Sequence, residues 1–169
     1  MPRRVMGKAI AASGPFQRAS DWTRQVATEL GSVLLDTLGL AATIEWHLHQ
    51  FQICTGMLYE LTVNDSAGFE LSDECAGAIF DSYCESLSNV ARHARAHRVV
   101  IVLSITPQAV TLAVSDNGIG LDDRTFATSE GGLAAMRARL QALQGSCELT
   151  GGRNAGTTIT VGLPISRAP

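Results

Sequence analysis

Four polar side chains lie close together between residues 85 and 93. Glu85, Asn89 and Arg92 are separated by four and three positions, so a helix would present them on one face, with His93 beside them. The amide oxygen of Asn89 is a hard ligand suited to a divalent cation, and Glu85 could orient or deprotonate a nucleophile. A guanidinium and an imidazole one turn later suit phosphate oxygens. Taken alone, this stripe also fits the solvated face of an amphipathic helix.

A glycine-containing segment comes directly after a β-rich run that ends near Asp116. Gly118 and Gly120 flank one isoleucine, so the backbone can turn tightly there and approach a flat ligand closely. The Asp116 carboxylate could accept a hydrogen bond from an exocyclic amine such as that of adenine. An ordinary Asp-Asn-Gly turn would contain the same residues. The segment lacks the third glycine of the dinucleotide-binding fingerprint, and the chain contains no Gly-Lys-Ser/Thr of a Walker loop.

Two more glycine-containing segments follow. Gly131 and Gly132 stand immediately before a predicted helix, where backbone amides suit phosphate oxygens. Gly156 introduces the last predicted strand, and the hydroxyl of Thr157 could bridge to a base through water. Groups suited to a cation, to phosphates and to a base therefore occur in four separate segments.

The elements that must position these residues alternate between helical and strand-like periodicity. Ser72 can cap a long helix that runs to about Ala94, because apolar side chains recur within it at intervals of three and four. Strands are predicted at 57–63, 98–105, 109–115, 146–150 and 157–163, and further helices at 20–38 (capped by Ser20), 41–54 and 133–143. Hairpins mixed with long helices predict an α+β sandwich rather than a repeating βαβ unit.

Composition excludes several classes of protein. Of the 169 residues, 46% are hydrophobic and 17% are charged, which is enough for a core and atypical of a disordered segment. The net charge of −3 gives no electrostatic reason to expect nucleic-acid binding. The longest apolar runs are too short to cross a bilayer, so a cytoplasmic protein is expected. The four cysteines show no C-x-x-C spacing, which favours reduced thiols over a zinc site.

Four segments in this order resemble the boxes of the nucleotide-binding family shared by histidine kinases, gyrase-type ATPases and MutL. Residues 85–93 resemble the asparagine box, 116–120 the first glycine box, 131–133 the second and 156–157 the third. The resemblance continues to Leu163-Pro164. It implies a Bergerat-type fold: a two-layer α/β sandwich with a mixed, mostly antiparallel sheet, helices on one face, and a helical segment in front.

Two of these segments resemble one branch of the family more closely. Residues 86–94 and 132–139 are similar to kinases of the nitrate-sensor type, which pair with LuxR-type response regulators. Residues 34–46 resemble the stretch that joins the second dimerisation helix of these kinases to the ATP-binding domain. The resemblance implies that 1–56 is a remnant of the dimerisation region and its linker, and that 57–169 is the histidine-kinase-like catalytic domain.

The resemblance also implies ATP and Mg²⁺ as ligands and a role for each matching residue. Glu85 would be the catalytic residue that polarises the attacking group, and Asn89 would be the Mg²⁺ ligand. Asp116 would read the adenine amine, and residues 121–130 would form the lid over the phosphates. The other implied nucleotide-contacting residues are Arg92, His93, Gly118, Gly120, Gly131, Gly132, Leu133 and Thr157.

The chain departs from the family pattern in two places. Glu130 stands where the second glycine box often begins with glycine, which alters the expected geometry of the lid. No histidine is followed by an acidic residue, as the phosphoacceptor motif requires. His47, His49 and His97 are therefore expected to have surface or packing roles. The sequence predicts a truncated kinase whose acceptor histidine lies outside this chain.

The resulting hypothesis is the catalytic domain of a two-component sensor histidine kinase that transfers the γ-phosphoryl group of Mg-ATP. Its expected partners are a phosphoacceptor and dimerisation domain and a LuxR-type response regulator. The apolar stripe of residues 20–36 could pair in a weak homodimer, fold back on the domain or promote aggregation. Two alternatives stay open: a degenerate ATP-binding regulatory module without kinase activity, and a stand-alone serine kinase of the anti-sigma type.

Overall fold

A computed structural model describes residues 14–66, 68, 70–120 and 131–165; the predicted lid at 121–130 lies outside the described residues. Two π-helical turns, labelled η, continue α-helices. In chain order, the elements are α2 (Pro15–Gln25), η1 (Val26–Leu30), α3 (Gly31–Leu38), α4 (Leu40–Thr55), β1 (Leu58–Asp65), α5 (Asp73–Asn89), η2 (Val90–Ala94), β2 (Arg98–Ile105), β3 (Ala109–Asp116), α7 (Gly132–Ala142), β4 (Ser146–Gly151) and β5 (Thr157–Pro164).

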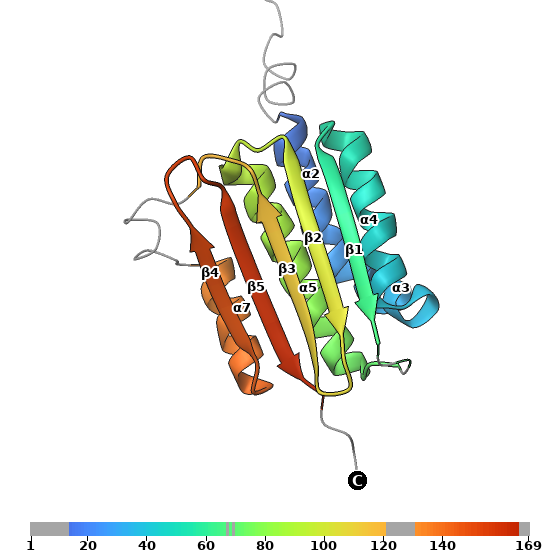
Figure 1. Ribbon diagram of the computed structural model, residues 1–169. Helices are drawn as coiled ribbons and strands as arrows, with labels where there is room; N and C mark the ends of the chain where they lie inside the picture. Colours follow the sequence, from blue (N-terminus) through green and yellow to red (C-terminus); the bar gives the residue numbers. More distant parts are fainter. Residues whose placement is uncertain (1–13, 67, 69, 121–130, 166–169) are drawn as a thin grey trace, which may run out of the picture.

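The strands form one mixed sheet in the order β1-β2-β3-β5-β4. β1 is parallel to β2, and the other pairs are antiparallel. Side chains in β2 alternate between buried and more exposed positions, because successive residues of a strand point to opposite faces. Helices α4, α5 and α7 lie on the same face of the sheet (Figure 1). The predicted α+β fold, with helices on one face of a mostly antiparallel sheet, is confirmed.

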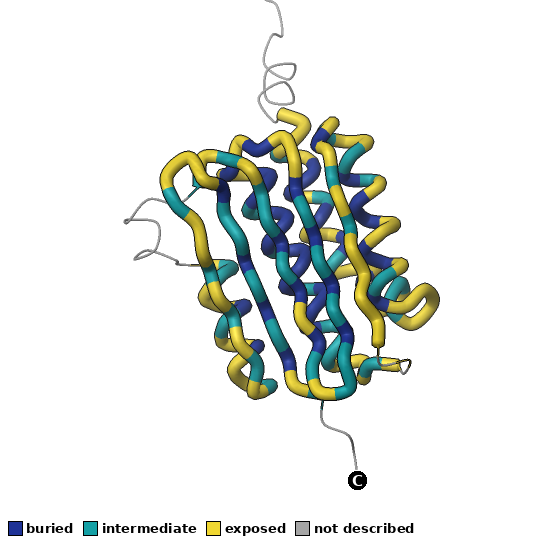
Figure 2. Tube along the Cα trace, in the orientation of Figure 1, coloured by how far each residue is buried: buried dark blue, intermediate teal, exposed yellow. Residues whose placement is uncertain are grey.

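The hydrophobic core lies between the sheet and this helical layer. Tyr83 and Phe80 of α5 and Phe51 of α4 are among its largest fully buried side chains. In Figure 2, buried positions lie along the central strands and along the helices that cover them. One continuous cluster of buried residues includes side chains from α2 to β5, so the helical segment and the sheet share a core.

Helix α2 packs against both α4 and α5. The ring of Trp22 stacks on His47 of α4, with 4.5 Å between ring centroids. The hydroxyl of Ser20 lies 2.6 Å from that of Ser88 on α5, and both side chains are buried. The sequence left three possibilities open for the apolar stripe of residues 20–36: dimerisation, packing on the domain, or aggregation. The structure shows it packed on the domain.

The predicted start of this helix was wrong. Ser20 is a buried residue in the middle of α2 and does not cap it, because its hydroxyl faces Ser88. The helix begins at Pro15, after Gly14 as the N-cap residue. Proline at the first helical position has a suitable fixed φ and lacks only an N–H that would be unpaired there. The Gly-Pro pair was therefore the signal for the true start.

The cysteines agree with the expectation of reduced thiols. All four cysteines are free thiols, and burial raises the pKa of Cys84 well above its usual range. Such a thiol is unreactive, because the thiolate is the nucleophilic form. Within the described ranges, no helix combines the length and apolar character needed to span a membrane.

His47 of α4 is fully buried between α2 and α5. Its Nδ1 lies 2.8 Å from the hydroxyl of Tyr83, while Nε2 has no hydrogen-bond partner in the described part of the chain. Burial lowers the pKa of His47 from 6.5 to about 3, because the imidazolium would lose its hydration. His47 thus has the packing role expected from the sequence.

We expect acidification to destabilise the fold through His47. The unfolded chain takes up a proton below pH 6.5, whereas the folded chain keeps His47 neutral down to about pH 3. The contribution of His47 is therefore complete above pH 6.5 and is lost as the pH falls, at up to about 1.4 kcal/mol per pH unit. Urea unfolding at several pH values should show a shallower pH dependence for His47→Gln.

The matched control is His49→Gln, which removes an exposed histidine from the same helix. This variant should keep the pH dependence of the unsubstituted chain. If the free energy of unfolding changed equally with pH in all three proteins, His47 would not couple folding to protonation.

Candidate functional site

Helix α5 and the turn η2 carry the polar stripe. Ser72 caps α5 by accepting a hydrogen bond from the Cys75 backbone N–H at 3.3 Å. The apolar face of α5 is buried, so Glu85 and Asn89 lie at its half-buried edge, one turn apart. Arg92 and His93 follow in η2, where both are exposed.

Glu85 lies directly against the start of α7. A Cβ atom added to Gly132 would overlap the Glu85 carboxylate, so a side chain at this position would require the end of the Glu85 side chain to shift away. The preceding Gly131 has a φ of +98° and serves as the N-cap residue of α7. Leu133 packs against the hydrophobic core, which fixes the first turn of α7. The structure therefore brings the asparagine-box glutamate and the second glycine pair into contact.

Asp116 is the half-buried last residue of β3, opposite Thr157 at the start of β5. Its carboxylate accepts a hydrogen bond of 2.8 Å from the Gly118 backbone N–H. Burial raises the pKa of Asp116, while hydrogen bonds from the backbone of Gly118 and Thr157 act in the opposite direction. These contacts hold the carboxylate in one place, with oxygen lone pairs still available to a ligand.

The first glycine segment packs against two other backbones. A Cβ atom on Gly118 would overlap the carbonyl of Ala94, which also accepts a hydrogen bond of 2.8 Å from the Ile119 N–H. Gly120 has a φ of +72°, and a Cβ there would overlap the carbonyl of Gly152. Ala94 directly follows His93 in η2, so this segment adjoins the end of the polar stripe.

Two residues outside the predicted site set hold these segments together. A Cβ on Gly156, which has a φ of +72°, would overlap the carbonyl of Asp116. The Asn117 side-chain oxygen accepts hydrogen bonds from the backbone N–H groups of His97 and Arg98, at 3.1 and 3.0 Å. Asparagine commonly bonds nearby backbone in turns, so the Asp-Asn-Gly sequence carried a signal for this role.

The structure therefore forms two clusters of predicted site residues. One joins Glu85 to Gly132, and the other joins Asp116 to Gly118 and Thr157. Arg92 makes a different contact, since its guanidinium lies 3.9 Å from the Asp21 carboxylate of α2. Glu130, like the rest of the predicted lid, lies outside the described residues.

The residues present can contribute to a magnesium site. No group of three or more His, Cys, Asp or Glu residues in the described ranges is arranged to hold a metal ion. The chain's contribution would therefore be the Asn89 amide oxygen, with Glu85 one turn away. Such a donor set fits Mg²⁺, which usually keeps several waters and takes further ligands from phosphate oxygens.

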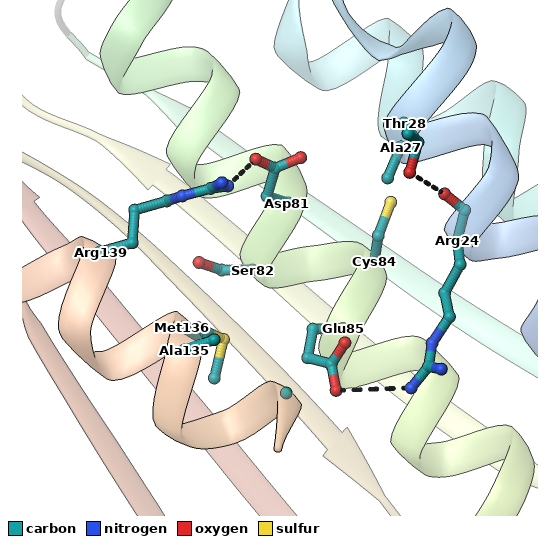
Figure 3. Close-up of a pocket in the computed structure, with 11 residues that line it drawn as sticks. Arg24, Ala27, Thr28, Asp81, Ser82, Cys84, Glu85, Ala135, Met136 and Arg139 are labelled. Carbon is teal, nitrogen blue, oxygen red and sulfur yellow. Dashed lines mark hydrogen bonds and ion pairs between the residues drawn. The ribbon is translucent and has the colours of Figure 1, made fainter.

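A cavity of about 600 Å³ adjoins Glu85 and lies between α2 and η1 on one side and α5 and α7 on the other (Figure 3). Its lining residues are Arg24, Ala27, Thr28, Asp81, Ser82, Cys84, Glu85, Gly132, Ala135, Met136 and Arg139. Arg24 reaches toward Glu85, with 3.9 Å between Nη2 and Oε1. Sequence spacing could not reveal this pair, because the two residues come from separate helices.

Residues 78–167, more than half of the chain, match the family of histidine kinase-, DNA gyrase B- and HSP90-like ATPases. The chain belongs to this family. The match covers all four boxes, so the resemblance inferred from them is confirmed. Within the matched stretch, Glu85 of α5 lies against Gly132 of α7, and Asp116 of β3 is bonded by Gly118.

Among curated proteins, this ATPase-family chain is similar to sensor histidine kinases. NarS of Mycobacterium tuberculosis is 30% identical over 166 residues, which are 96% of this chain and 37% of NarS. The nitrate/nitrite sensor protein NarX of Escherichia coli is 34% identical over 77 residues, 46% of this chain and 13% of NarX. The chain therefore spans well under half of either relative.

A solved structure shows the same fold. The histidine kinase domain of the Erythrobacter litoralis EL346 blue-light activated histidine kinase superposes with a TM-score of 0.63 at 20% identity. The superposition covers 89% of this chain and 75% of that domain. The helical segment in front of the sheet is thus largely included in the common architecture.

Proposed function

We propose that this chain is the ATP-binding catalytic domain of a two-component sensor histidine kinase. It binds Mg-ATP and transfers the γ-phosphoryl group to a histidine outside this chain. The observation that best supports this proposal is the contact between Glu85 and Gly132. It places a carboxylate suited to proton transfer at the start of the helix that we expect to receive the phosphates.

The base and the phosphates would contact different elements. Asp116 accepts a hydrogen bond from the exocyclic amine of adenine, and Thr157 supports the base through water. Gly118 and Gly120 keep the backbone close to the base. Arg92, His93 and the backbone of residues 131–133 contact the phosphates. Asn89 holds Mg²⁺, which neutralises phosphate charge when it is bound.

The chemical step requires little covalent participation from this chain. A ring nitrogen of the acceptor histidine forms a bond to the γ-phosphorus, the bond from that phosphorus to the β–γ bridging oxygen breaks, and ADP leaves. Glu85 accepts the proton that the imidazole loses. Catalysis comes mainly from holding the two reactants in line.

The rest of the chain would link this chemistry to signalling. Residues 1–56 serve as part of the dimerisation region and its linker, and residues 57–169 serve as the catalytic domain. The partners are a phosphoacceptor and dimerisation domain and a LuxR-type response regulator. The reaction takes place in the cytoplasm.

A regulatory ATP-binding module without kinase activity is the second candidate. It is favoured by Glu130, which stands where the second glycine box often begins with glycine and so departs from the family pattern beside the predicted phosphate site. The two functions differ in phosphoryl transfer and agree in nucleotide binding.

Phosphoryl transfer to a separately supplied acceptor domain tests the proposed function. With γ-labelled ATP and the phosphoacceptor domain of a sensor histidine kinase, we expect base-stable, acid-labile label on the acceptor. Glu85→Gln keeps the size of the side chain but cannot accept the proton, so transfer should fall by roughly 100-fold or more. ATP affinity should change little. ATP binding without label transfer by the unsubstituted chain would favour the regulatory module instead.

A further inference from the structure

We propose that Arg24 of α2 contacts the nucleotide phosphates, so that the N-terminal helix completes a site otherwise built by α5, α7 and β3. This inference rests on the proposed function, because it takes the phosphates to bind beside Glu85 and Gly132. It adds a residue from outside the stretch that matches the ATPase family, which begins at residue 78.

Arg24 shares a cavity with Glu85 and Gly132 of the proposed site. Its Nη2 lies 3.9 Å from Glu85 Oε1, and Glu85 itself lies against Gly132. Arg24, Glu85 and Gly132 all line the cavity of about 600 Å³ between α2, α5 and α7. Figure 3 shows the Arg24 side chain running along the cavity wall toward the Glu85 carboxylate. A phosphate bound at Gly132 would therefore be within reach of the guanidinium.

The packing of α2 fixes the backbone from which Arg24 projects. Trp22 stacks on His47, Ser20 bonds Ser88, and Thr23 is fully buried. At the end of α2, the hydroxyl of Thr28 in η1 donates to the Arg24 carbonyl at 2.9 Å (Figure 3). The π-helical turn η1 begins two residues after Arg24, and such turns are frequent at functional sites. Only the side chain of Arg24 would have to move.

The charges around the cavity single out Arg24. Of the described residues that line it, Arg24 and Arg139 are the cationic ones, and Arg139 is held in a close ion pair with Asp81. The pair between Arg24 and Glu85 is at the outer limit of an ion pair, and the Arg24 side chain is 43% exposed. A triphosphate beside Glu85 would bring like charges together, and a guanidinium between them would offset that repulsion.

The test is nucleotide affinity measured by calorimetry for the full chain and for Arg24→Ala. Loss of a guanidinium–phosphate contact should weaken Mg-ATP binding roughly tenfold and leave adenosine binding unchanged. Arg24→Lys should restore part of the ATP affinity, because a lysine keeps the charge without the planar fork. Arg18→Ala is the matched control, since it removes the same charge from the same helix six positions away, and its ATP affinity should equal that of the unsubstituted chain.

If Arg24→Ala melts at a lower temperature, the ATP affinity of Arg24→Gln decides the test, because glutamine keeps polar contacts with Glu85. Unchanged or increased ATP affinity in both variants would overturn the role of Arg24 while the proposed function stands. An equal loss of ATP and adenosine affinity would also overturn it, because it would indicate general damage to the site. Absence of ATP binding by the unsubstituted chain would remove both the inference and the proposed function.

Discussion

Replacement of Asp116 by alanine is expected to lower the affinity for ATP by roughly 10- to 100-fold. Two causes act together. The variant loses the acceptor for the adenine amine, and it frees the Gly118 N–H that Asp116 now binds at 2.8 Å. The second loss loosens the segment from 116 to 120, whose glycines are in contact with the backbones of Ala94 and Gly152. Calorimetric titration of both proteins with ATP would measure the effect.

Base selectivity gives this prediction a sharper readout. Guanine presents a carbonyl where adenine presents its exocyclic amine, so the Asp116 carboxylate should disfavour GTP. The unsubstituted chain should prefer ATP, and Asp116→Ala should reduce that preference. Glu148→Ala, which removes an exposed carboxylate from β4, is the control and should change neither affinity. An ATP preference that survives in Asp116→Ala would show that another residue reads the base.

Replacement of Gly156 by alanine is expected to destabilise the fold by about 2–4 kcal/mol. The φ of +72° at Gly156 disfavours any side chain, and the new Cβ would overlap the carbonyl of Asp116. Because that neighbour is backbone in β3, the overlap can be relieved only by moving the strand end that carries the Asp116 carboxylate. Both the free energy of unfolding in urea and the affinity for ATP should fall.

Gly152 offers a matched control in the same turn. A Cβ there would meet only the side chain of Ala155 at 3.8 Å, which is an ordinary contact. The free energy of unfolding of Gly152→Ala should therefore lie within about 0.5 kcal/mol of that of the unsubstituted chain. If both variants lost similar amounts of unfolding free energy, the overlap with the Asp116 carbonyl would not be the cause of the destabilisation.

The strands and the long helix could be predicted because their burial patterns have a clear period. The strand predicted at 98–105 coincides with β2, and the one at 109–115 is one residue shorter than β3. Each has buried apolar residues at every second position. The long helix was placed by its serine cap and its apolar spacing, which fix a face without any knowledge of its neighbours.

The packing of α2 could not be predicted in the same way. Its period shows that one face is apolar, but not which surface that face covers. The contacts of Trp22 with His47 and of Ser20 with Ser88 join residues from separate helices. The role of Arg24 depends on those contacts, so no motif could have indicated it. The proposed boundary between residues 56 and 57 is a functional one. It does not divide the chain into separate folding units, because one core extends across it.

The central claim is that the clusters around Glu85 and Asp116 form one Mg-ATP site. Calorimetric titration of the unsubstituted chain with ATP, with and without Mg²⁺, tests it most directly. We expect saturable binding of one ATP per chain that is tighter with Mg²⁺, because Asn89 and the phosphates would share the ion. A folded chain that binds no ATP under either condition would contradict the claim and leave the four boxes as a scaffold without a nucleotide.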